Sequence, residues 1–162
     1  LLQHYDVLVA RKEYSHRGVW QAYLDCGREK DLLQTEQVVR KLYPDYLDVF
    51  YKEFRDGVGN YPANMMVCSR RVLDAYCTWL FAILEEVERN TDLTGYTVQE
   101  ARIYGYLSER LLGVHRNRIS LVIGACLPVH SYYKQKLCGL QGQAIDNLLT
   151  NFPRIPEEMC LF

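Results

Sequence analysis

The sequence lacks the short motifs that mark several common functional classes. It contains no phosphate-binding loop of the form G-x-x-x-x-G-K-[ST], no G-x-G-x-x-G, no G-x-S-x-G and no H-E-x-x-H. None of its six cysteines stands in a C-x-x-C pair, which disfavours a zinc knuckle or a thioredoxin-like redox site. The four histidines are far apart, and no D-x-D pair is present to hold a nucleotide-bound metal. We therefore predict no metal site within this sequence.

Strong net charge and long apolar runs are also missing. The chain has 19 basic and 20 acidic residues and a net charge of −1, so no broad electrostatic field attracts nucleic acid. The apolar run at residues 121–129 is far shorter than the roughly 18 to 20 residues of a membrane-spanning helix. No signal peptide is recognisable. These features predict a cytoplasmic protein that does not bind nucleic acid.

Aromatic residues, in contrast, are abundant. The chain has 13 tyrosines and two tryptophans, a supply expected near a sugar site or a large interface. Its 162 residues are enough for one domain with a buried core. The cysteines are scattered along the chain, and free thiols in a reducing compartment are favoured over disulfides, which stay an alternative.

Hydrophobic patterning predicts an α/β fold that is rich in helices, with a few short strands packed by long helices. Apolar residues recur at spacings of three and four over residues 29–42 and 70–89. Apolar runs at residues 5–10, 63–68 and 117–125 predict short strands. Further helices are expected at residues 19–24, from Pro44 onward and at 141–149, followed by an extended tail over the last ten residues.

Capping residues delimit the two central helices. Ser69 is suited to the N-cap of the helix that follows it. Thr97 and Glu100 have the spacing of a capping box, in which each side chain satisfies a backbone N–H at the start of a helix. The second helix is therefore expected at residues 97–112, with Gly113 as its C-terminal stop.

This second helix carries the best candidates for chemistry. Arg102 and Glu109 lie seven residues apart, so two helical turns place them on one face. A glycine inside a helix costs up to about 1 kcal/mol relative to alanine, so Gly105 predicts that something packs closely against the backbone there. A carboxylate and a guanidinium beside an apolar face can act as a general base and an anion clamp. The alternative is a structural ion pair of Glu109 with Arg102 or Arg110.

Two further side chains are candidates for substrate contact. Asn64 follows Tyr61-Pro62 at the start of an expected strand, where its amide either binds a ligand hydroxyl or caps the strand entrance. Trp79 is offset from the main apolar stripe of its helix. It either stacks on a sugar ring or is a partly buried core or interface residue.

Several of these residues also carry a resemblance to a known family. The most specific block is residues 102–111, with the pattern R-hydrophobic-aromatic-G-aromatic-L-x-E-R-L. Supporting matches are Asn64-Met65, Thr78-Trp79-Leu80-Phe81, Tyr5-Asp6 and Tyr43-Pro44-Asp45-Tyr46. Over residues 3–125 the chain resembles a bacterial, glycosyltransferase-like family of capsular, exopolysaccharide and O-antigen gene clusters, which is catalogued as a domain of unknown function.

The resemblance implies a fold and an activity. Residues 1–125 would form the C-terminal part of a GT-A-like glycosyltransferase domain, and residues 126–162 a C-terminal helix and extended tail. Such an enzyme, of hexosyltransferase type, transfers a sugar from a nucleotide-sugar donor to a glycan or lipid-linked acceptor, in the cytoplasm or at the inner face of the membrane. This chain matches only the later part of the family domain. No cofactor is therefore evident in it, and Mn²⁺ or Mg²⁺ would act in the full domain.

The resemblance also implies roles for individual residues. Glu109 is the candidate base that deprotonates the acceptor hydroxyl, and Glu100 is the second candidate. Arg102 and Arg110 would offset charge on a diphosphate leaving group. Much of the donor site would come from a missing N-terminal half, from a protein partner or from an oligomer.

The competing hypothesis is a non-enzymatic one. The chain would then be a helical interaction module whose aromatic surface packs on a partner protein, and it would expose a large apolar patch. An enzyme would instead have a cleft lined by Asn64, Arg102 and Glu109. The two hypotheses are separated by whether these side chains converge.

Overall fold

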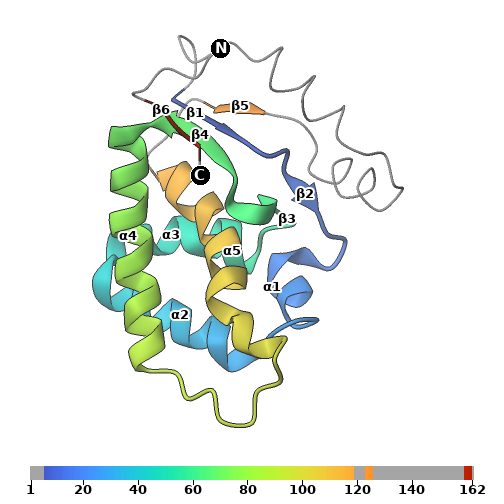
Figure 1. The fold of residues 1–162 in the computed structure, drawn as a ribbon. Coiled ribbons are helices and arrows are strands. Elements are labelled where there is room, and N and C mark those ends of the chain that lie inside the picture. The colour runs from blue at the N-terminus through green and yellow to red at the C-terminus, as the bar shows by residue number, and fades with distance from the viewer. Residues whose placement is uncertain (1–5, 119–122, 126–158, 162) are drawn as a thin grey trace.

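A computed structural model describes residues 6–118, 123–125 and 159–161 (Figure 1). Its strands are β1 (Val7–Val9), β2 (Glu13–Tyr14), β3 (Gly59–Asn60), β4 (Met66–Ser69), β5 (Ile123–Ala125) and β6 (Met159–Leu161). The main sheet has the strand order β5-β1-β4-β6, and a second sheet pairs β2 with β3. β1 runs antiparallel to β4 and parallel to β5, while β4 runs antiparallel to β6.

The helices lie below the main sheet in the view of Figure 1. They are α1 (Gly18–Tyr23), α2 (Glu29–Leu42), α3 (Leu47–Phe50), α4 (Arg70–Arg89) and α5 (Ile103–Arg118). Short 3-10 turns cover Pro44–Tyr46, Pro62–Asn64 and Glu100–Arg102, and a π-helical turn covers Tyr51–Arg55. α2 and α4 have the bounds that their apolar periodicity predicts, and the helix-rich α/β class is confirmed. No helix among the described residues is both long and apolar enough to cross a membrane.

The expected helix caps are present. The Ser69 hydroxyl accepts a hydrogen bond from the backbone N–H of Val72 at 3.4 Å, as the N-cap of α4. Thr97 and Glu100 make the two reciprocal bonds of a capping box, at 2.7 and 3.2 Å. The first of these local bonds explains why the start of α4 could be located from the sequence.

Three predicted elements have wrong boundaries. The helix at 97–112 starts instead with a 3-10 turn, and α5 then continues through Gly113 to Arg118. Gly113 does not have the positive φ of a helix-stop glycine, and it is buried facing Glu53 and the Tyr61 ring. The strand expected at 63–68 begins only at Met66. The first two residues of the strand expected at 117–125 belong instead to α5. The helix expected at 141–149 lies outside the described residues.

A single core joins the sheet to the helices. Phe50 and Phe54 are fully buried and stack with their ring centroids 4.6 Å apart. From α5, Leu107 and Leu111 reach the same core, as do Leu80 and Ile83 from α4. Burying these faces fixes the rotation of α5 about its axis. The start of α5 leaves Gly105 exposed to solvent, whereas every residue from Arg110 to His115 is buried.

Candidate functional site

A backbone turn holds the carboxylate of Glu109. The Oε1 atom of Glu109 accepts a hydrogen bond from the backbone N–H of Ala63 at 3.1 Å. The next residue, Asn64, donates its side-chain amide to the Ser108 hydroxyl at 2.6 Å, and Ser108 donates to the Gly105 carbonyl at 2.8 Å. The turn that precedes β4 is thus attached to α5 at two adjacent residues, Ser108 and Glu109.

The backbone of this turn is strained. Ala63 and Asn64 have φ angles of 64° and 50°, in the left-handed region that residues with a Cβ rarely adopt. Each such residue costs on the order of 1 to 3 kcal/mol, and strain of this kind clusters at functional sites. Asparagine tolerates the conformation better than alanine, so the Ala63 backbone carries the more unusual strain. This conformation is what directs the Ala63 N–H at Glu109.

The outer face of α5 is hollowed beside Glu109. The hollow has a volume of about 310 Å³ and is lined by Arg102, Tyr104, Gly105, Tyr106 and Glu109. The Arg102 guanidinium lies over the Tyr106 ring, 5.5 Å from its centroid. Within the described part of the chain, no ion pair joins Glu109 to Arg102 or Arg110. The alternative explanation, a structural ion pair of Glu109 with one of these arginines, therefore does not hold.

Gly105 departs from the sequence-based expectation. No described atom other than those of its own helix and its neighbours in the chain lies within 4 Å of the position that a Cβ would take. The prediction of close packing against this glycine is therefore wrong. Gly105 is exposed and forms part of the lining of the hollow.

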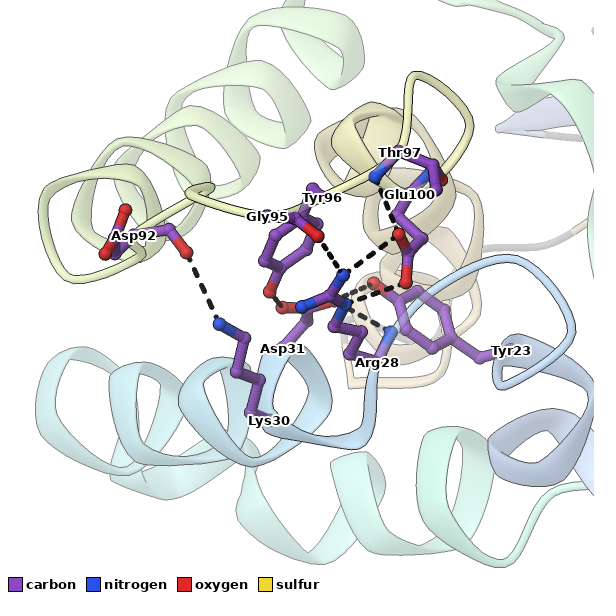
Figure 2. Close-up of polar contacts among 9 residues, drawn as sticks. All are labelled: Tyr23, Arg28, Lys30, Asp31, Asp92, Gly95, Tyr96, Thr97 and Glu100. Atoms are coloured by element: carbon purple, nitrogen blue, oxygen red, sulfur yellow. Dashed lines mark hydrogen bonds and ion pairs between the residues drawn. The ribbon is translucent and has the colours of Figure 1, made fainter.

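Glu100 lies outside the hollow, in an ion pair with Arg28 (Figure 2). Arg28 Nε donates to Oε1 at 2.7 Å and Nη2 donates to Oε2 at 3.1 Å. The bonds from Arg28, together with those from Thr97, lower the pKa of Glu100 to about 2. Such an anion is a poor proton acceptor near neutral pH, so this geometry favours Glu109 over Glu100 as a base.

The same cluster contains a buried carboxylate that the sequence analysis did not single out. Asp31 is 0% exposed and accepts hydrogen bonds from the Arg28 backbone N–H at 3.0 Å and the Tyr23 hydroxyl at 3.1 Å. The Tyr96 hydroxyl also donates to it, and the Arg28 guanidinium stacks 4.1 Å from the Tyr96 ring centroid. Figure 2 shows how these residues bring the loop before α5 against the start of α2. The one sequence signal that could have indicated this role is the place of Asp31 at the third position of α2, where a carboxylate can bond to the backbone at the start of the helix.

Arg110 is buried and does not line the hollow, although its charge interacts with that of Glu109. It is 9% exposed, donates to the Tyr106 carbonyl at 2.8 Å and lies 5.0 Å from the Tyr23 ring centroid. Burial lowers the pKa of its guanidinium. Arg110 therefore packs between α5 and α1 and does not line the hollow next to Arg102.

Trp79 belongs to a buried aromatic cluster. Its ring lies 5.1 Å from that of Tyr46 and 4.8 Å from that of His115, measured between centroids. Tyr76 completes the cluster, 5.3 Å from His115. Trp79 is thus placed in the core, on α4, and not in the lining of the hollow.

His115 gives this cluster a predictable response to pH. The imidazole is 4% exposed, neither ring nitrogen has a hydrogen-bond partner among the described residues, and burial lowers its pKa to about 4. Between pH 6.5 and 4 the unfolded chain takes up a proton that the folded chain does not, so stability falls as the pH falls. We expect the free energy of unfolding, measured with urea, to be about 2 kcal/mol lower at pH 5 than at pH 7 from this residue.

Two variants test that assignment. His115→Phe keeps an aromatic ring in the cluster and should remove most of the decrease between pH 7 and pH 5. The exposed His16→Gln variant should retain it. An unchanged decrease in His115→Phe would assign the pH dependence to other groups.

The described residues do not form a metal site. No group of three or more histidine, cysteine, aspartate or glutamate side chains within them is arranged to hold an ion. The site residues Glu109 and Arg102 also offer one carboxylate and one cation, which is not a set suited to a divalent ion. Any metal of a donor site would need ligands other than these.

The comparisons with known proteins agree with this fold. A family model described as "Domain of unknown function (DUF4422)" matches residues 1–119. Among solved structures, the chain is similar to the apo structure of the WbbM bifunctional glycosyltransferase, with a TM-score of 0.71 and 26% sequence identity. That match covers 76% of this chain and 23% of the other, so the chain spans about a quarter of its solved relative. No curated protein sequence matches the chain.

Proposed function

The chain belongs to the DUF4422 family of domains of unknown function, and from this premise we propose that it supplies the acceptor side of a glycosyltransferase. The observation that carries the proposal is the hollow on α5, where Glu109 and Arg102 face the same open space in a glycosyltransferase-like fold. The acceptor is a saccharide or a lipid-linked glycan, and the donor is a nucleotide sugar. The product is a surface polysaccharide such as a capsule, an exopolysaccharide or an O-antigen.

Glu109 acts as the general base in this proposal. Its Oε1 is held by the Ala63 N–H, and no described residue bonds to Oε2, which is left to accept the proton of an acceptor hydroxyl. The hydroxyl oxygen then forms a bond to the anomeric carbon of the donor. The bond from that carbon to the diphosphate breaks, and its electron pair leaves with the nucleoside diphosphate.

The other parts of the reaction are assigned to residues beyond the hollow. The donor nucleotide would bind to a further part of the domain, a partner protein or a second copy of the chain. A divalent ion, Mn²⁺ or Mg²⁺, would stabilise the leaving diphosphate there. The reaction would take place in the cytoplasm, at the inner face of the membrane when the acceptor is lipid-linked.

Saccharide binding to the hollow tests the proposal. Ligand-observed NMR would measure the purified chain against neutral mono- and disaccharides of glucose, galactose, mannose and N-acetylglucosamine. Arg102→Ala is expected to weaken binding about tenfold, because a charged hydrogen bond contributes about 1.5 kcal/mol or more. The matched variant Arg89→Ala, at the exposed end of α4, should leave Kd unchanged. Failure of every saccharide to bind, or equal affinity in both variants, would contradict the proposal.

A further inference from the structure

Gly105 has no local structural reason to be glycine. It lies within α5, where a glycine weakens the helix, and its φ is not positive. A Cβ added to it would meet no described atom within 4 Å, whereas a Cβ at Gly57 would lie 2.1 Å from the Glu53 carbonyl oxygen. Gly95 also differs from it, because Gly95 has a φ of +75°. The fold thus accounts for the other two glycines and not for Gly105.

Gly105 lies between the two charged side chains of the hollow, Arg102 and Glu109. It follows Arg102, the last residue of the 3-10 turn before α5, by three residues and precedes Glu109 by four, and all three residues line the hollow. The absence of a side chain leaves bare helix backbone between a guanidinium and a carboxylate. The aromatic side chains of Tyr104 and Tyr106 flank this backbone.

We infer that Gly105 is the surface on which the acceptor sugar ring lies, and that its missing side chain determines which acceptors fit. The inference rests on the proposed function and names the residue that sets its specificity. A ring over Gly105 reaches Glu109 with one hydroxyl and Arg102 with another. Any side chain at residue 105 would occupy the same space.

The charges of the hollow indicate the class of sugar. Among the lining residues, Arg102 carries one positive charge and Glu109 one negative charge, so the lining has no net charge. A neutral ring rich in hydroxyl groups matches this balance, because hydroxyls donate to the carboxylate and accept from the guanidinium. An acidic sugar would instead bring a second carboxylate into a lining whose one cation is Arg102. The hollow therefore favours a neutral hexose over a uronic acid.

Substitutions at Gly105 should move stability and binding in opposite directions. Gly105→Ala and Gly105→Leu both favour the helix, and a Cβ at residue 105 meets no described atom within 4 Å, so Tm should rise by about 2 to 4 °C. Binding of the neutral saccharides, measured by ligand-observed NMR, should weaken about threefold to tenfold in Gly105→Ala and more than about thirtyfold in Gly105→Leu. Gln37→Leu adds a leucine at an exposed site of α2 and should leave Kd unchanged.

Each outcome has a distinct meaning. Unchanged Kd in Gly105→Leu, together with a loss of binding in Arg102→Ala, would overturn the role of Gly105 and leave the proposed function standing. Absence of saccharide binding in the wild-type chain would overturn both. Glucuronic acid that binds more than about tenfold tighter than glucose would overturn the assignment to neutral sugars. A lower Tm in both glycine variants would show that Gly105 is required by the fold.

Discussion

Glu109→Gln is expected to reduce glycosyl transfer by a factor of about 10² to 10⁴, the range that a positioned general base supplies. The substitution is conservative in shape, and the amide oxygen of glutamine can still accept the hydrogen bond that the Ala63 N–H donates at 3.1 Å. The side chain thus keeps its position but cannot take up a proton. Acceptor binding should change less than about threefold, because the hydroxyl still has an oxygen to approach. The expected loss is in kcat.

The measurement is the initial rate of sugar transfer by a family member that contains the donor site, with the matching glutamate replaced. The matched control in that protein is the residue equivalent to Glu85, since Glu85 is an exposed glutamate of α4 whose one ion pair among the described residues is with Arg89. Its replacement by glutamine should leave the rate within twofold. Transfer that persists in Glu109→Gln at a rate close to the wild type would show that another group accepts the proton, and would remove the role assigned to Glu109.

Which features could be predicted from the sequence depends on how locally each is determined. The start of α4 needs only Ser69 and the apolar period that follows it, and both lie within a few residues. The spacing of seven residues predicted that Arg102 and Glu109 lie on one side, and both line the hollow although Arg102 belongs to the 3-10 turn before α5. In contrast, the continuation of α5 through Gly113 is a matter of tertiary packing, because Leu112, Gly113 and Val114 are all buried in the fold.

The contacts that hold the site in place could not be predicted, because they join residues that are distant in sequence. Arg28 and Glu100 pair across 72 positions of the chain, and no local pattern relates them. The left-handed Ala63 is opposed by its own backbone preference, so a tertiary contact must impose it. The sequence predicts that residues 61–64 lead into a strand. Only the hydrogen bond to Glu109 shows that this turn positions the carboxylate. The candidate base was therefore predictable, and the residues that hold it were not.

Asp31→Ala is expected to destabilise the fold by about 3 to 5 kcal/mol, because it removes the acceptor of three hydrogen bonds in the interior. The Tyr23 hydroxyl and the Arg28 N–H would lose their partner, as would the Tyr96 hydroxyl. Since this cluster also ties the loop before α5 to α2, hydrogen exchange of the Arg102 amide should become faster. Tyr96→Phe, which removes one of the three donors, should cost about 1 kcal/mol.

Urea denaturation followed by circular dichroism measures these differences, and Asp25→Ala is the matched control. Asp25 pairs with Arg17 at the exposed surface, where a salt bridge contributes little to stability. The Tm of the Asp25→Ala variant should therefore stay within about 1 °C of that of the wild type. Asp31→Asn keeps the shape but turns an amide group toward a donor, and its stability should fall between those of the wild type and Asp31→Ala. Equal stability of the Asp25 and Asp31 alanine variants would mean that the buried cluster does not hold the loop. In that case the geometry of the hollow would depend on the turn at Ala63 and Asn64 alone.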